Sequence, residues 1–173
     1  MDIVVAPIAT DATRGTLRYK TFAFPCVLGR GGVRDDKHEG DGATPIGRYA
    51  LKKVFYRSDK LMMPTTRLPI APIMQDDGWC DAPEDPNYNR PVKLPYHASA
   101  ENMWRDDGLY DVVVVLGHND DPVVPGAGSA IFIHVTAPDL TPTAGCVALA
   151  REDLLSILRA LPGATFIDIR AAF

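Results

Sequence analysis

The chain has 173 residues, of which 46% are hydrophobic and 23% charged, and its formal net charge is −4 at pH 7. This composition is that of a globular protein and excludes an intrinsically disordered chain, and the length suits one domain, residues 1–173. The basic residues are scattered, which disfavours a nucleic-acid partner because counterion release needs clustered Lys and Arg. No apolar run approaches the roughly 18 residues that span a bilayer, so we expect no membrane span.

Apolar runs rich in β-branched and aromatic residues recur along the chain and predict strands. In chain order they occupy residues 3–6, 21–28, 47–55, 111–116, 129–136 and 165–169. Clusters of Gly, Pro and Asp separate them, and the 15 prolines suit a sheet with rigid loops better than a helical bundle. The predicted fold class is therefore mainly β with minor α.

One or two helices are expected to pack against this sheet. Residues 151–161 place four leucines on one helical face and acidic residues in the first turn. Residues 99–107 have Ser99 as a candidate N-cap and Gly108 as a stop. The segment 151–161 follows Cys146 closely, so we expect it to pack beneath that cysteine.

The middle of the chain, residues 57–96, is rich in proline and shows little periodicity. Loops of this length in a compact domain are usually functional. Trp79 and Tyr88 lie in this segment and are candidates for a wall against a substrate, although such aromatics more often pin a loop to the core.

Cys146 is the cysteine with the strongest chemical context. The other two, Cys26 and Cys80, are too distant for a disulfide framework. Cys146 follows Gly145, and His134 ends an apolar run upstream. An imidazolium beside a thiol can lower its pKa and give a thiolate at neutral pH, and a glycine permits backbone N–H groups to converge on an oxyanion. The alternative is that Cys146 is a buried structural residue.

Two segments together resemble the YkuD-type L,D-transpeptidases, and the resemblance spans roughly residues 3–158. The first is a histidine followed by Ser/Thr-x-Gly-Cys, present here as His134 and then Thr143-Ala144-Gly145-Cys146-Val147. The second is a Thr-Pro-x-Gly-x-aromatic strand entry, present here as Thr44-Pro45-Ile46-Gly47-Arg48-Tyr49.

The resemblance implies a β-sandwich or barrel catalytic domain and a cysteine acyltransferase without cofactor. Carried over by position, Cys146 is the nucleophile, His134 the general base, Gly145 part of the oxyanion support, and Thr143 a hydroxyl lining the site. The implied partners are peptidoglycan stem peptides, cross-linked through a thioester whose acyl residue is an L-centre, diaminopimelate or L-alanine. Such an enzyme serves cell wall biogenesis and cell shape and is a carbapenem target.

Two other functions remain open. With water as acceptor the protein is an L,D-carboxypeptidase of peptidoglycan recycling, and without activity it is a wall-binding module. Asp2 stands where a secretory signal carries basic residues, and the first apolar run stops at Pro7. No export signal is visible, so we expect the periplasm or cell envelope if the protein is exported and the cytoplasm otherwise.

The chain departs from the family pattern around the cysteine. Many members carry a histidine before Gly-Cys and an Arg or Asn two residues after it, whereas this chain has Ala144 and Ala148. Another cation must then bind the donor carboxylate. Arg30 and Arg48 are the candidates, because a guanidinium binds a carboxylate with two parallel hydrogen bonds.

His118 and Asn119 form a second polar cluster at the end of the run 111–116. If that run neighbours the one ending at His134, His118 lines the site or replaces His134 as base. The ordinary alternative is a turn, which Asn and Asp favour. None of the four histidines shows the paired spacing of a typical zinc site, so no metal is expected.

Overall fold

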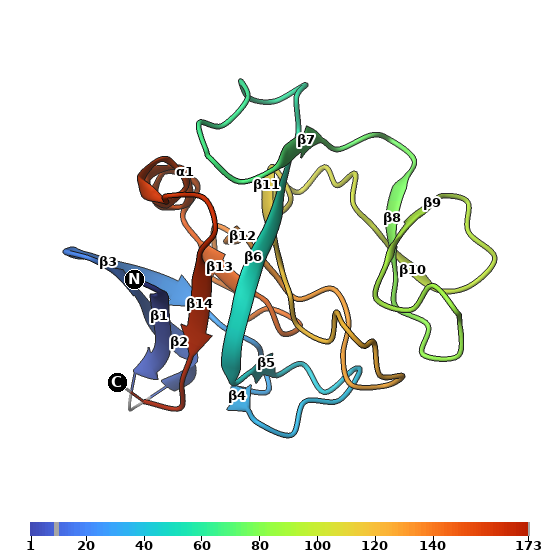
Figure 1. Cartoon of the computed structure of the whole chain (residues 1–173), viewed down its shortest axis with the longest axis horizontal. Coiled ribbons are helices and arrows are strands. Elements are labelled where there is room, and N and C mark those ends of the chain that lie inside the picture. The colour runs from blue at the N-terminus through green and yellow to red at the C-terminus, as the bar shows by residue number, and fades with distance from the viewer. Residues whose placement is uncertain (9–10, 173) are drawn as a thin grey trace.

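A nine-stranded sheet forms the body of the protein in the computed structural model, which describes residues 1–8 and 11–172 (Figure 1). Its strands, in sheet order, are β11 (Val112–Leu116), β12 (Phe132–Val135), β13 (Val147–Leu149), β3 (Phe22–Val27), β2 (Asp11–Tyr19), β1 (Ile3–Ile8), β14 (Phe166–Ile169), β6 (Gly47–Tyr56) and β7 (Ile70–Pro72). Because β11 also pairs with β6, the sheet closes on itself as a barrel.

Smaller elements complete the fold. A three-stranded sheet has the order β10 (Ala100–Asn102), β8 (Asp77–Cys80) and β9 (Pro91–Lys93), and β4 (Val33–Arg34) pairs with β5 (Thr44–Pro45). One helix, α1 (Arg151–Ala160), packs against the barrel. The mainly β prediction is confirmed, with one of the two expected helices formed.

The segment 99–107 was expected to be a helix, and this expectation is wrong. Ala100 and Asn102 instead pair with Cys80 and Gly78 of β8, and the Asn102 side chain accepts the backbone N–H of Trp104 in a tight turn. The backbone groups of this segment therefore serve the small sheet. Pairing with β8 therefore outweighs the weak helix-capping signals at Ser99 and Gly108.

Several strands were missed by pattern, among them β2 and β13 of the large sheet. β2 lies between β1 and β3 and carries arginines, threonines and a glycine, so its apolar alternation is faint. β13 has only three residues, too few to show a period. β13 matters for the site, because it begins directly after Cys146.

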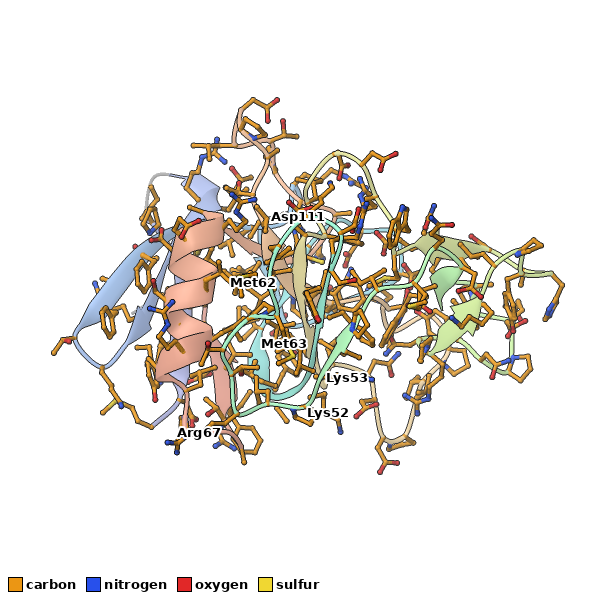
Figure 2. The ribbon with its side chains drawn as sticks, turned by 90° about the horizontal axis from the view of Figure 1, so that it is seen from above. Lys52, Lys53, Met62, Met63, Arg67 and Asp111 are labelled. Carbon is orange, nitrogen blue, oxygen red and sulfur yellow. The ribbon has the colours of Figure 1, made fainter. Side chains whose placement is uncertain are left out.

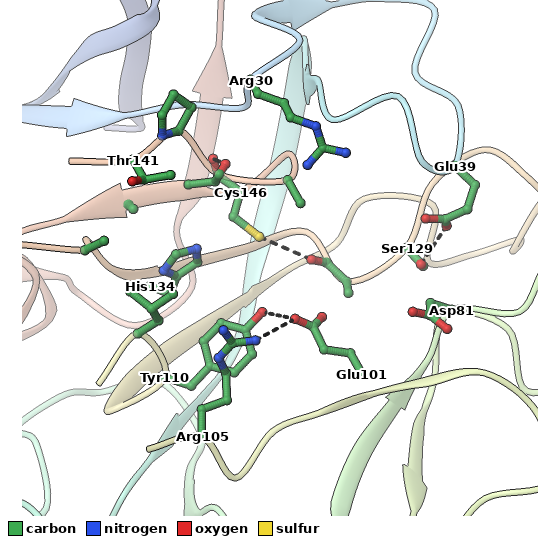
Figure 3. A pocket seen from close by; sticks show the side chains of 17 residues that line it. Arg30, Glu39, Asp81, Glu101, Arg105, Tyr110, Ser129, His134, Thr141 and Cys146 are labelled. Atoms are coloured by element: carbon green, nitrogen blue, oxygen red, sulfur yellow. Dashed lines mark hydrogen bonds and ion pairs between the residues drawn. The ribbon is translucent and has the colours of Figure 1, made fainter. Parts of the chain in front are cut away.

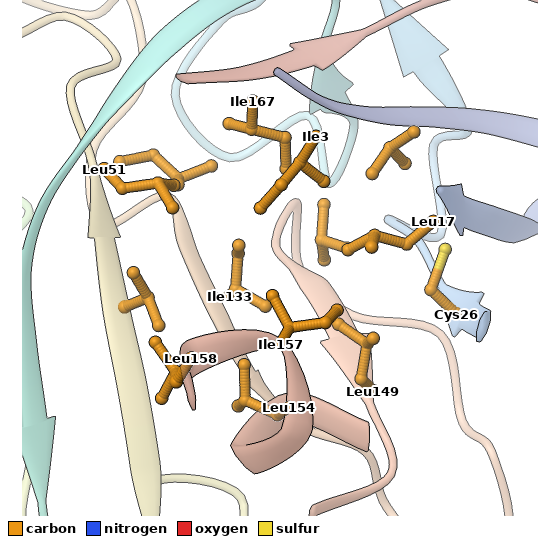
Figure 4. Packing of buried hydrophobic residues seen from close by; sticks show 14 of the residues in the cluster. Ile3, Leu17, Cys26, Leu51, Ile133, Leu149, Leu154, Ile157, Leu158 and Ile167 are labelled. Atoms are coloured by element: carbon orange, nitrogen blue, oxygen red, sulfur yellow. The ribbon is translucent and has the colours of Figure 1, made fainter. Parts of the chain in front are cut away.

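The barrel interior is filled by aliphatic side chains from the strands and from α1 (Figure 4). Leu154, Ile157 and Leu158 of α1 are each at most 3% exposed and pack toward Ile133 and Leu149. The helix thus lies under the strands that carry the site, as its position after Cys146 suggested.

A second apolar cluster lies between the barrel and the small sheet. β11 supplies both clusters, because Val112 and Val114 face the first while Val113 and Val115 face the second. Alternation of faces along a strand explains why β11 is an unbroken apolar run. Cys146 belongs to the second cluster, so the cysteine lies at the junction of barrel and small sheet.

The surface beside α1 carries the loop of residues 57–69. Figure 2 shows Met62 and Met63 on this loop, and they are 91% and 64% exposed. Within the described residues, no helix is long and apolar enough to cross a membrane.

Truncation of Leu154 to alanine tests how much α1 stabilises the barrel. We expect Leu154→Ala to lower the free energy of unfolding by about 2–5 kcal/mol, because it removes a buried side chain and leaves a cavity. Urea unfolding followed by circular dichroism measures this. Ser156→Ala, on the exposed side of the same helix, should change stability by about 0.5 kcal/mol or less, and equal losses in both variants would contradict the packing role.

Candidate active site

The parallel pairing of β12 and β13 brings Cys146 and His134 together. His134 pairs with Ala148, and Ile133 pairs with Val147. Side chains two residues apart on a strand share a face, so Cys146 and His134 are diagonal neighbours on the same face of the sheet. Both line one cavity of about 490 Å³ between the barrel and the small sheet (Figure 3).

Cys146 lies deep in this cavity, with 7% of its surface exposed. Its Sγ donates to the carbonyl oxygen of Ala130 at 3.3 Å and accepts the backbone N–H of Phe132 at 3.4 Å. Burial raises the pKa of the thiol to about 12, and the negative charge of Glu101 adds to the shift. The resting sulfur is therefore a protonated thiol.

His134 is held in one tautomer by the backbone. Its Nδ1 lies 2.8 Å from the carbonyl oxygen of Val135, and because a carbonyl only accepts, Nδ1 carries the proton. The Nε2 atom is then a free base. Burial lowers the pKa of the imidazole to about 4, so the ring is neutral at pH 7.

The expected thiolate beside an imidazolium is therefore not the resting state. A buried thiolate and a buried imidazolium would each lose their hydration, and this desolvation cost is not visible in the sequence pattern. A neutral thiol and a neutral imidazole remain, and proton transfer must accompany attack on a carbonyl. The arrangement suits general-base activation of a nucleophile.

Two threonines hold the main chain of the cysteine. The hydroxyl of Thr143 donates to the carbonyl oxygen of Cys146 at 2.7 Å, and the buried hydroxyl of Thr44 donates to the same oxygen at 3.4 Å. Thr44 also accepts the backbone N–H of Gly29 at 2.8 Å. The Thr-Pro strand entry and the Gly-Cys segment, distant in sequence, thus meet at one carbonyl group.

Gly145 is required at its position by conformation. Its φ is +137°, and a Cβ there would lie 2.8 Å from the carbonyl oxygen of Ala43. Its N–H donates to the hydroxyl of Thr143 at 3.1 Å. This N–H is therefore engaged in the resting structure, and Gly145 directs the chain into Cys146.

A scan of protein families matches residues 9–169 to the YkuD family, described as an L,D-transpeptidase catalytic domain. The chain belongs to this family. The match covers nearly the whole chain, and the barrel with one helix is consistent with the YkuD fold. A search of curated proteins gives no match.

The position occupied by Arg or Asn in many YkuD members is Ala148 here, and it lines the cavity. Of the two candidate replacements, Arg30 also lines the cavity, anchored by its backbone N–H to Thr143. Arg48 does not. It is exposed and bonded to Asp2 at 2.6 Å, so the structure places Arg48 away from this cavity.

His118 and Asn119 lie outside the cavity. His118 Nε2 donates to the carbonyl oxygen of Ala127 at 3.0 Å, so this ring nitrogen is committed to the loop 119–128. The Asn119 side chain donates to Val124 and Gly128 within that loop. Both side chains bond within this loop, and neither lines the cavity that holds Cys146.

Trp79 and Tyr88 are buried and do not line the cavity. Trp79 donates to the Asn89 side chain, which accepts the backbone N–H of Ala130, and the Tyr88 hydroxyl accepts the N–H of Gly128. The structure therefore does not bring them into the cavity wall beside Cys146. They hold the segment whose Ala130 carbonyl meets the thiol.

The cavity also contains charged residues that the sequence did not single out: Glu39, Asp81, Glu101 and Arg105. Glu101 and Arg105 fall in the segment mistaken for a helix, so no local pattern marked them. Among the described residues, no three His, Cys, Asp or Glu side chains are grouped to hold a metal ion.

The protonation state of Cys146 is tested by alkylation. Because its pKa is raised to about 12, we expect the rate of iodoacetamide labelling of Cys146 to climb about tenfold per pH unit up to pH 9, in proportion to the thiolate fraction. Mass spectrometry of the modified peptide measures the rate. A plateau reaching down to acidic pH would instead show a resting thiolate and imidazolium.

An isosteric substitution tests how much the hydrogen bonds of the Thr44 hydroxyl stabilise the protein. Thr44→Val leaves the Gly29 N–H and the Cys146 carbonyl without this partner, so we expect a loss of about 1–3 kcal/mol in unfolding free energy. Thr44→Ser keeps the hydroxyl and should recover most of that loss. Equal losses in Val and Ser variants would assign the effect to packing of the methyl group.

Proposed function

We propose that this protein is a peptidoglycan L,D-transpeptidase, a cysteine acyltransferase that cross-links stem peptides through a thioester on Cys146. The observation that carries the proposal is the thiol of Cys146 beside the unprotonated Nε2 of His134 in one cavity. Membership of the YkuD family supports the reaction type and the wall substrate.

In acylation, Sγ of Cys146 attacks the carbonyl carbon of an L-residue in the donor stem, diaminopimelate or L-alanine. His134 Nε2 takes the thiol proton as the C–S bond forms. The C–N bond to the following residue then breaks, and His134 returns the proton to the leaving amine. The backbone N–H of Cys146 is our candidate oxyanion donor, with Gly145 shaping the turn.

Arg30 is our candidate for binding the donor carboxylate. It lines the cavity next to Thr143, and its guanidinium extends toward the cavity in Figure 3. Arg105 is the other cation there, but it is bonded to Asp107 at 3.1 Å through Nε. Arg30 therefore substitutes for the Arg that many YkuD members carry at the position of Ala148.

Carbapenem labelling tests the nucleophile and the base. Intact-mass spectrometry should show one adduct on the wild-type protein, none on Cys146→Ala, and an unchanged adduct on Cys80→Ala. His134→Ala should slow labelling by about 100-fold or more, as loss of a general base does. His118→Ala, whose ring lies outside the cavity, should label within a few-fold of wild type.

Labelling of Cys146→Ala, or an unaffected rate in His134→Ala, would overturn the proposal. Incubation with a disaccharide-tetrapeptide then separates the two enzyme functions. Cross-linked dimers indicate transpeptidation, whereas tripeptide alone indicates a carboxypeptidase with water as acceptor.

A further inference from the structure

One wall of the active-site cavity is acidic. Glu39, Asp81 and Glu101 come from three separate segments and line the same cavity as Cys146. In Figure 3, Glu101 and Asp81 lie across the cavity from the cysteine, with Glu39 and Ser129 beside them. The proposed acylation step uses none of these carboxylates, so their place beside the thiol needs a separate explanation.

Glu101 is the carboxylate whose charge acts on the sulfur. After burial, its charge is the largest cause that raises the pKa of Cys146. The Tyr110 hydroxyl donates to Glu101 Oε1 at 2.5 Å, and Arg105 reaches the same oxygen at 3.8 Å. Both contacts use Oε1 and hold the carboxylate in place. Tyr110 also packs against the ring of His134, at 5.4 Å between centroids.

Asp81 supplies an independent observation. Its Oδ1 is buried and has no hydrogen-bond partner among the described residues. A buried carboxylate oxygen without a donor is costly, so Oδ1 of Asp81 is open to a hydrogen-bond donor from a bound molecule. The Asp81 side chain is directed into the cavity in Figure 3. Glu39 differs, because Ser129 donates to its Oε2 at 2.7 Å, as does the Tyr88 hydroxyl.

We propose that Glu101 and Asp81 bind the ammonium group of the acyl acceptor and hold that amine against the thioester on Cys146. A primary ammonium has three N–H donors, which match carboxylate oxygens placed around one point. The inference rests on the proposed transpeptidase function and names the residues that select an amine over water as acceptor.

The proton balance follows from this placement. The bound ammonium gives one proton to the Glu101 carboxylate, and the neutral amine nitrogen attacks the thioester carbonyl. That nitrogen gives a second proton to His134 Nε2, the C–S bond breaks, and His134 passes the proton to the departing sulfur. The products are an amide, the thiol of Cys146 and a protonated Glu101, which then releases its proton to solvent.

The test separates the two half-reactions in the protein of 173 residues. Glu101→Gln removes the charge and keeps the shape. We expect carbapenem acylation of Glu101→Gln to be no slower than in wild type, because removing this charge lowers the pKa of Cys146. Transfer from a disaccharide-tetrapeptide donor to an amino-acid amine should instead fall by about tenfold or more. Transfer to hydroxylamine, which is neutral near pH 7, should stay close to wild type. Liquid chromatography with mass spectrometry measures both products.

Asp81→Asn should show the same selectivity with a smaller loss. Glu152→Gln, an equal charge change at a residue whose side chain is 82% exposed on α1, is the matched control and should transfer to both nucleophiles like wild type. The inference would be overturned if Glu101→Gln transferred the acyl group to the amino-acid amine as fast as wild type does. It would also be overturned if Glu101→Gln lost the same factor in transfer to the amine and in transfer to hydroxylamine. Absence of acylation in the wild-type protein would overturn the proposed function itself.

Discussion

The parallel register of β12 and β13 is the constraint on which the site depends. It sets Ala148 opposite His134, and so places Cys146 on the histidine's face of the sheet. A shift of one residue would turn the cysteine toward the barrel interior. Hydroxyl groups of Thr143 and Thr44 hold the cysteine carbonyl at this register, which explains why a threonine from a distant strand entry belongs to the same motif set.

Burial then decides the chemistry of the pair. The cavity lies between barrel and small sheet, where low solvent access raises the pKa of the thiol and lowers that of the imidazole. Both groups rest uncharged, and the Val135 carbonyl leaves Nε2 as the basic atom. In the proposed mechanism, a reactive thiolate is formed only as the proton moves to His134.

The positive and negative side chains of the cavity come from different parts of the fold. Arg30 comes from the glycine-rich loop before β4, whereas Glu101 and Asp81 come from the small sheet and the turn beside it. The barrel and its loops therefore supply the proposed nucleophile, the proposed base and the cation proposed for the donor, and the small sheet supplies the carboxylates proposed for the acceptor. In this arrangement, Trp79 and Tyr88 act as supports for the Ala130 segment that contacts the thiol.

The sequence alone determined those features of the protein that depend on residues close together in the chain. Apolar periodicity gave the mainly β class and α1, and the spacing of His134, Gly145 and Cys146 with the Thr-Pro entry gave the family. Contacts between distant segments determined the rest. Arg48 and Arg30 looked alike in sequence, yet pairing with Asp2 removes only Arg48 from the site. Glu101 carried no local signal, because its position beside Cys146 arises from β10 pairing with β8 rather than from a helix. Protonation likewise depends on burial, which exists only once the barrel and small sheet enclose the cavity.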